Sequence, residues 1–256
     1  MFKKLSLGIL LFTTNLYADK ITIAVAANVS YAIKELSTVF NKDYPHIKVN
    51  VVLGSSGKLT AQIKHGAPYD LFMSANMKYP NTLHQQNLTL NKPIVYAQGT
   101  LSLFSPKKKD IQKGIYLATD DSISRIAIAN PKTAPYGKAT FEAMKSAAIY
   151  KKVKHKFIYG ESISQTVSYA VSATDIGFIA TSSLYSPKMK NYKKGIHWEK
   201  INPQLYHPIN QGIVILKQAE KRPEVQAFYD FILSKKAKKI FEIYGYIVPK
   251  EKANHE

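Results

Sequence analysis

The chain has 256 residues, no cysteine, and 36 Lys and Arg against 17 Asp and Glu, which gives a formal net charge of +19. This length allows one large domain or two modest ones. The lack of cysteine excludes disulfides, thiolate metal sites and lipid attachment through a thiol. Because the basic residues occur in scattered runs without interleaved aromatic residues, we expect a solvated basic surface and no nucleic-acid partner.

The first residues have the order of a secretory signal peptide. Lys3 and Lys4 precede an apolar stretch over residues 5–12, and a short polar patch then leads to Ala18. The apolar stretch is too short to span a bilayer, which argues against the alternative of an uncleaved anchor helix. We therefore predict a signal peptide over residues 1–18, cleavage after Ala18 and a periplasmic location.

Strand and helix patterns alternate along the rest of the chain. Apolar or alternating runs predict strands over residues 20–26, 47–53, 69–75, 94–104, 125–130, 155–160, 175–180, 196–201 and 209–217. Helical periodicity follows several of these strands, over residues 29–40, 58–65, 138–150, 163–171 and 222–234, and a last helix ends near Gly245. This alternation predicts an α/β architecture with mostly parallel sheets flanked by helices.

Two long central strands, 94–104 and 209–217, divide the chain into an outer and an inner block. We predict two lobes joined by two crossings, with lobe one over residues 19–98 and 211–256 and lobe two over residues 99–210. Ligands of open α/β sheets bind beyond the carboxyl ends of the strands. The ligand cleft is therefore expected between the lobes, with a hinge at the two crossings.

Four short loops connect a predicted strand to the helix that follows it, at residues 27–30, 55–57, 134–137 and 161–163. Each helix beginning leaves N–H groups unpaired and carries a partial positive charge. Asn28, Ser56 and Tyr136 add neutral side-chain donors. If the loops converge, they form a pocket for a small, fully ionised oxyanion. Taken singly, Asn28, Ser56 and Ser162 are also typical helix N-caps.

Other site patterns are incomplete. A Walker loop needs glycine five positions before a Gly-Lys pair, but Val52 stands at that distance from the pair at Gly57. No serine lies in a nucleophile elbow, and the seven histidines are scattered without an i, i+4 pair. Glu161 is the one carboxylate in the four loops, so an enzyme on this scaffold is the weaker alternative. We predict no enzyme and no cofactor.

A set of motifs occurs in order along the mature chain: "ITIAVAANVSYAIKEL", "GSSGKLTAQI", "GAPYDLFMSA", "ANPKTAPYGKATFEAM", "YGESISQTV", "DIGFI" and the closing "AFYDFILSKKAKKIFEIYGY". Together they resemble the periplasmic molybdate-binding proteins of ABC importers. The resemblance implies a two-lobed type II periplasmic-binding fold. It also implies that a monomer captures molybdate or tungstate with neutral donors and delivers it to an inner-membrane permease.

The same resemblance assigns individual residues. It implies that molybdate is contacted by Asn28 and Ser56 in lobe one, and by Tyr136 and the backbone N–H of Ile163 in lobe two. Three further residues would line the pocket: Ala27, Ser55 and Ser162.

Three positions depart from the pattern of many family members. Asn28 stands where serine is common, and Tyr136 where a small residue is common. Ala180 occupies the place of a ligand-binding tyrosine after the "DIGFI" strand, so one phenolic donor is exchanged for another from a different loop. These departures leave open which oxyanion is preferred. A sulfate- or phosphate-binding protein on the same fold is the alternative.

Overall fold

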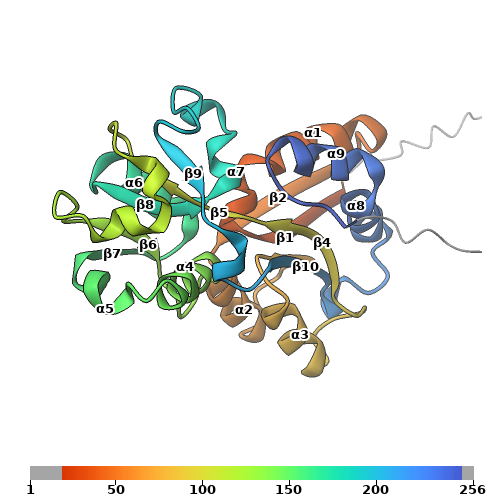
Figure 1. Ribbon diagram of the computed structural model, residues 1–256. Helices are drawn as coiled ribbons and strands as arrows, with labels where there is room; N and C mark the ends of the chain where they lie inside the picture. The colour runs from red at the N-terminus through yellow and green to blue at the C-terminus, as the bar shows by residue number, and fades with distance from the viewer. Residues whose placement is uncertain (1–18, 250–256) are drawn as a thin grey trace, which may run out of the picture.

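Two five-stranded sheets flanked by helices form the two lobes of the computed structural model, which describes residues 19–249 (Figure 1). The predicted signal peptide over residues 1–18 lies outside the described residues, as do residues 250–256. Within residues 19–249, none of the helices combines the length and the apolar character that crossing a lipid bilayer requires.

The first lobe is built on a sheet with the strand order β2-β1-β3-β10-β4. Its strands are β1 (Asp19–Ala26), β2 (Ile47–Gly54), β3 (Leu71–Ser74), β4 (Ile94–Gly99) and β10 (Ile209–Ile215). Its helices are α1 (Ile33–Asp43), α2 (Ser56–Lys64), α3 (Lys78–Gln85), α8 (Pro223–Leu233) and α9 (Lys235–Ile243), with the 3-10 turns η1 (Ala27–Tyr31) and η6 (Lys217–Ala219). The buried rings of Phe40 and Phe228 meet edge to face, with centroids 5.0 Å apart, and so join α1 to α8.

The second lobe is built on a sheet with the strand order β7-β6-β8-β5-β9. Its strands are β5 (Leu101–Phe104), β6 (Ile126–Ala129), β7 (Phe157–Gly160), β8 (Ile176–Ala180) and β9 (Trp198–Lys200). Its helices are α4 (Pro135–Ser146), α5 (Tyr150–Val153), α6 (Ile163–Ser172) and α7 (Thr181–Leu184), with the 3-10 turns η2 (Ile111–Thr119), η3 (Lys154–Lys156), η4 (Pro187–Met189) and η5 (Pro203–Leu205). Every residue of β6 and β8 is buried, as expected for central strands covered on both faces.

Both sheets are mixed. β1 is parallel to β2 and β3, and β6 is parallel to β7 and β8. β10 and β5, however, are antiparallel to their neighbours. The chain enters these two strands by crossing from the other lobe, so no strand–helix–strand unit requires them to be parallel. The two-lobed α/β fold expected from the sequence is confirmed, and these two strands account for the mixed pairing.

The predicted strand over residues 94–104 is interrupted at Thr100. β4 ends at Gly99 in the first sheet, and β5 begins at Leu101 in the second. One continuous strand cannot pair in two separate sheets, so the chain leaves one sheet and enters the other at this residue. The return crossing runs from β9 through η5 to β10. The lobe boundaries predicted at 98/99 and 210/211 stay a prediction.

The carboxyl ends of neighbouring parallel strands are level with one another in each lobe. Ala26 of β1 pairs with Gly54 of β2, and Ala129 of β6 pairs with Gly160 of β7. Three of the four loops singled out in the sequence begin directly at these strand ends, and the fourth, at residues 134–137, follows β6 after residues 130–133. The pairing register therefore brings two helix beginnings together in each lobe.

Asp175 lies just before β8 and connects the start of this strand by hydrogen bonds to the residues before β6. Its carboxylate accepts hydrogen bonds from the backbone N–H groups of Ser124 and Arg125, at 2.9 and 2.8 Å. Burial alone would raise the pKa of Asp175, but these hydrogen bonds and the charge of Lys109 outweigh it and lower the pKa below its ordinary value. The carboxylate therefore stabilises the fold in its charged form.

We predict that Asp175→Asn lowers the melting temperature at pH 7. A carboxyl with a lowered pKa contributes stability above its unfolded pKa and loses this contribution as the pH falls through its folded pKa. The difference between variant and wild type should therefore narrow as the pH drops below about 4, which thermal denaturation over a pH series measures. Asp121→Asn, at an exposed position, is the control. A difference that stays constant with pH would contradict this role.

Candidate functional site

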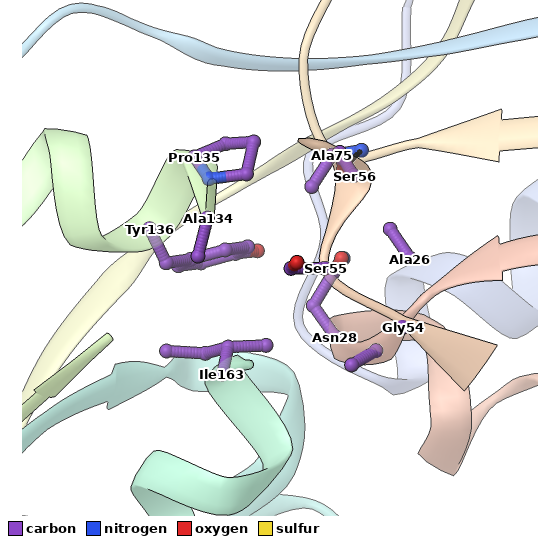
Figure 2. Close-up of a pocket in the computed structure, with 11 residues that line it drawn as sticks. Ala26, Asn28, Gly54, Ser55, Ser56, Ala75, Ala134, Pro135, Tyr136 and Ile163 are labelled. Carbon is purple, nitrogen blue, oxygen red and sulfur yellow. Dashed lines mark hydrogen bonds between the residues drawn. The ribbon is translucent and has the colours of Figure 1, made fainter. Parts of the chain in front are cut away.

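A small cavity lies between the lobes, where the strand ends of the two sheets face each other. Its walls are the ends of β1 and β2, the beginnings of η1 and α2, and, from the other lobe, the beginnings of α4 and α6. Figure 2 shows Asn28 and Ser55 on one side and Tyr136 and Ile163 on the other. None of the residues that line the cavity carries a charge.

Six of the seven residues predicted for the site lie at this cavity: Ala27, Asn28, Ser55, Ser56, Tyr136 and Ile163. Five further residues line the cavity, and their side chains are small or rigid: Ala26, Gly54, Ala75, Ala134 and Pro135. Ala75 follows β3, and the other four flank predicted positions. That these residues bind a ligand remains a prediction.

Ser162 differs from its prediction, because it does not line the cavity. Its hydroxyl accepts a hydrogen bond from the backbone N–H of Gln165 at 3.3 Å, which makes it the N-cap of α6. A capping hydroxyl is directed back onto its own helix. The next residue, Ile163, faces the cavity instead.

Tyr136 owes its position to a close approach between α4 and β6. Pro135 is the first residue of α4, where a missing N–H costs nothing. At Gly137 an added Cβ would lie 2.1 Å from the carbonyl oxygen of Ala129, so only glycine lets the first turn of α4 begin so close to the end of β6. Tyr136, only 1% exposed, is thereby held with its ring at the cavity.

Two adjacent serines present hydroxyl groups from lobe one. The Ser56 hydroxyl accepts a hydrogen bond from the backbone N–H of Ala75 at 2.9 Å, which leaves its own hydrogen for another acceptor. The buried Ser55 hydroxyl has no hydrogen-bond partner among residues 19–249. Buried polar groups without a partner are rare in proteins. This pair of hydroxyls is therefore suited to a polar guest.

The sequence predicts that the Asn28 carboxamide donates into the pocket, but its NH₂ group points away from the cavity toward Gln211 and Tyr246. Its Nδ2 donates to Oε1 of Gln211 at 2.8 Å and to the hydroxyl of Tyr246 at 2.9 Å. Its Oδ1 is buried and has no hydrogen-bond partner in the part of the chain that the structure describes. Both amide hydrogens are thus used within the protein, and the oxygen is the free end of the group.

Gln211 and Tyr246 were missed by the sequence reasoning. They lie 183 and 218 residues from Asn28 along the chain, so no local pattern connects them with it. The one available signal was the amide of Gln211 within the apolar strand "INQGIVILK". A buried amide in such a strand must find partners, but the sequence does not say which.

Three buried phenols surround these amides. Burial is the main cause that raises the pKa of Tyr96, Tyr136 and Tyr246 well above the ordinary value for tyrosine. All three hydroxyls are therefore protonated at physiological pH. The site behaves as a neutral hydrogen-bonding network, and no residue lining the cavity titrates near neutral pH.

Several hydrogen bonds close the two lobes onto each other around the cavity. The Gly57 N–H donates to the carbonyl of Thr133 at 2.9 Å, and the Ser182 hydroxyl donates to the carbonyl of Asn28 at 3.0 Å. At the exposed rim, Lys58 pairs with Glu161 at 3.0 Å. The remaining cavity is about 10 Å³, roughly the space for one water molecule.

This arrangement favours binding over catalysis. Glu161, the candidate acid or base, is exposed and paired with Lys58, and it does not line the cavity. Among residues 19–249, no group of three or more His, Asp or Glu is placed to hold a metal ion. The cavity offers hydroxyls, helix beginnings and amides, which can hold a small polar guest by hydrogen bonds.

Comparisons with known proteins agree with this geometry. A family model described as bacterial extracellular solute-binding protein matches residues 21–247. The molybdate-binding protein ModA of Azotobacter vinelandii is 32% identical over 243 residues, covering 94% of this chain and 95% of that protein. ModA of Rhodobacter capsulatus is 33% identical over 90% of this chain and 89% of its own length. The solved periplasmic molybdate-binding protein of A. vinelandii superposes with a TM-score of 0.83 at 29% identity, over 90% of this chain and 100% of that one.

The tight contact between Gly99 and Tyr136 gives a first test of the site. An added Cβ at Gly99 would lie 2.0 Å from the Tyr136 hydroxyl oxygen and 2.7 Å from Nε2 of Gln211. We predict that Gly99→Ala lowers the free energy of unfolding by about 1–3 kcal/mol through overpacking, measured by urea denaturation. Adding Tyr136→Phe should recover part of this loss, because it removes the closest atom. Thr100→Ala, at the next residue, is the control, and a double variant no more stable than Gly99→Ala would contradict the contact.

Proposed function

The chain belongs to the bacterial extracellular solute-binding proteins and, among them, to the ModA proteins, and from this membership we propose that it captures molybdate for an ABC importer. It is a binding protein and not an enzyme, and it requires no cofactor. Its site of action is outside the cytoplasm, and we propose the periplasm, reached by means of the signal peptide predicted over residues 1–18. Tungstate is the second candidate guest.

The observation that carries the proposal is an uncharged cavity formed where helices begin. Ser56 and Ile163 are the first residues of α2 and α6, and Tyr136 is the second residue of α4. Backbone N–H groups at these positions have no acceptor within their own helix. A fully ionised oxyanion only accepts hydrogen bonds, so it matches such a set of donors.

Magnitudes show that neutral donors are sufficient. A hydrogen bond to a charged acceptor contributes about 1.5–3 kcal/mol. About half a dozen such bonds, less the cost of desolvation and lobe closure, still leave roughly −8 kcal/mol, which corresponds to micromolar affinity. We propose that Asn28, Ser56, Tyr136 and Ile163 contact the oxyanion and that Ala27 and Ser55 complete the wall.

Capture requires the lobes to move. A tetrahedral oxyanion is larger than the cavity of about 10 Å³, so the guest enters an open form and the lining side chains adjust around it. We propose that the lobes turn about the two crossings, near residues 98–101 and 209–212, as in hinge-type domain closure. The closed monomer then presents the faces of both lobes to its permease.

Competition titration tests the choice of guest. Isothermal calorimetry of the purified protein should give micromolar or tighter binding of molybdate, with sulfate and phosphate binding more weakly. Tungstate in the same series shows whether the site separates the two heavier oxyanions. Tighter binding of sulfate or phosphate would replace molybdate with the alternative ligand on the same fold.

We predict that Ser56→Ala and Asn28→Ala each weaken molybdate binding by about 1.5–3 kcal/mol. The serine variant removes a hydroxyl whose hydrogen is available to the guest. The asparagine variant removes an amide whose Nδ2 we expect to donate to the guest once the carboxamide has rotated. Calorimetry of each variant measures the change. Ser172→Ala, at the exposed end of α6, is the matched control. Unchanged affinity in both site variants would remove the assignment of this cavity.

Closure itself is open to test at Gly57. An added Cβ would lie 2.8 Å from the Tyr79 hydroxyl and 3.0 Å from the backbone of Thr133 on the opposite lobe. We predict that Gly57→Ala holds the lobes apart, lowers affinity by about tenfold, and reduces the compaction that small-angle X-ray scattering detects when molybdate is added. Lys64→Ala, at the exposed end of the same helix, serves as the control, because it lies away from the contacts between the lobes. Full compaction of the Gly57 variant would show that closure does not need this contact.

A further inference from the structure

Gln211 lies behind the cavity and does not line it. It is fully buried, and it lies in β10 next to a shift in the pairing register with β4. A buried carboxamide in a sheet interior is costly unless its oxygen and nitrogen are both hydrogen-bonded. Its partners therefore show what holds it there.

Those partners join the two lobes. Gln211 Oε1 accepts from Asn28 Nδ2 at 2.8 Å and from the Tyr96 hydroxyl at 3.3 Å, both within lobe one. Its Nε2 donates to the Tyr136 hydroxyl at 3.4 Å, on α4 of the other lobe. One amide thus contacts a cavity-lining side chain from each lobe.

The direction of each bond decides what the cavity presents. Because the Tyr136 oxygen accepts from Gln211, its own hydrogen is free to be donated to a guest. Asn28 gives its amide hydrogens to Gln211 and Tyr246, so its unpartnered Oδ1 is the atom left over. In this arrangement Tyr136 offers a donor and Asn28 offers an acceptor.

Rotation of the Asn28 carboxamide requires the Gln211 carboxamide to rotate as well. If the Asn28 carboxamide rotated to direct Nδ2 at a guest, its Oδ1 would face Oε1 of Gln211, and two acceptors repel each other. Rotation of Gln211 relieves this contact but places Oε1 beside the Tyr136 hydroxyl, which then donates to Gln211. The side chains of Asn28 and Tyr136 therefore exchange the roles of donor and acceptor together.

We propose that Gln211 is a positioning residue that couples Asn28 to Tyr136, so that one of these side chains donates to the bound oxyanion while the other donates to Gln211. The proposal rests on the proposed function, because it takes an oxyanion as the guest. Gln211 acts through the two side chains and does not touch the guest itself.

A near-isosteric charge change provides the test. In Gln211→Glu, an ionised carboxylate accepts from both Asn28 and Tyr136 and draws both donors away from the guest. We expect molybdate affinity to fall by about tenfold or more at pH 8 and to recover toward pH 5.5, where the buried carboxyl is protonated and can donate to Tyr136. Wild-type affinity should stay flat over this range, because no residue lining the cavity titrates there.

Matched variants separate positioning from a general loss of structure. Gln62→Glu places the same charge at a half-buried position on α2 that does not line the cavity, and it should change affinity little at any pH. Gln211→Met keeps the size but loses both bonds, so affinity should fall equally at all pH values. If Gln211 acts through Tyr136, combining Gln211→Met with Tyr136→Phe should cost no more than the larger single effect.

Additive losses in that double variant, or a Gln211→Glu protein that binds as tightly as wild type at pH 8, would overturn the proposal. A second measurement needs no guest: in NMR spectra of ¹⁵N-labelled protein without anion, Gln211→Met should shift the side-chain amide signals of Asn28, whereas Gln62→Glu should not. Unshifted signals would overturn the coupling. If wild-type protein binds no molybdate, the proposed function fails, while the NMR comparison still decides the coupling.

Discussion

The unpaired N–H groups where α2, α4 and α6 begin are the constraint on which the rest of this structure depends. Such groups need an acceptor when they are buried, and here Ser56, Tyr136 and Ile163, which carry three of them, line one small cavity. The pairing register of β1 with β2 and of β6 with β7 places the helix beginnings level with one another within each lobe. Closure then brings the two sets face to face. In the function that we propose, a small anion satisfies them together, which neither lobe does alone.

Buried residues behind the cavity keep its lining uncharged. Tyr96, Tyr136 and Tyr246 are buried deeply enough to remain protonated. Gln211 joins Tyr96 and Tyr136 to Asn28, and Tyr246 is hydrogen-bonded to Asn28 directly. A lysine at this depth would add attraction for any anion, and a carboxylate would add repulsion. Hydroxyls and amides instead select by geometry and by the number of hydrogen atoms on the guest. The basic character of the chain lies elsewhere, as in the exposed Lys58 at the rim.

The sequence was most informative where the role of a residue depends on residues close to it in the chain. Strand, loop and helix recur within about 20 residues, so the four loops and the residues Asn28, Ser56 and Tyr136 could be predicted from local patterns. Ala27, Ser55 and Ile163, which also line the cavity, were assigned by the family resemblance. Ser162 shows the limit, because an N-cap and a ligand-facing serine have the same local sequence. Gln211 and Tyr246 reach Asn28 only through the fold, and the interruption at Thr100 depends on which sheet each half of the run joins.

The order of strands in the first sheet also affects how the chain is made. β10 lies between β3 and β4, although it follows both by more than a hundred residues. β4 therefore has no strand beside it until β10 has been synthesised, whereas the second sheet is complete within residues 101–200. During synthesis or export, the second lobe can fold as a unit. The first lobe remains incomplete, and the edge of β3 that later pairs with β10 is still unpaired. Such an edge is open to pairing with another chain, so the final quarter of the polypeptide protects the nascent molecule from aggregation.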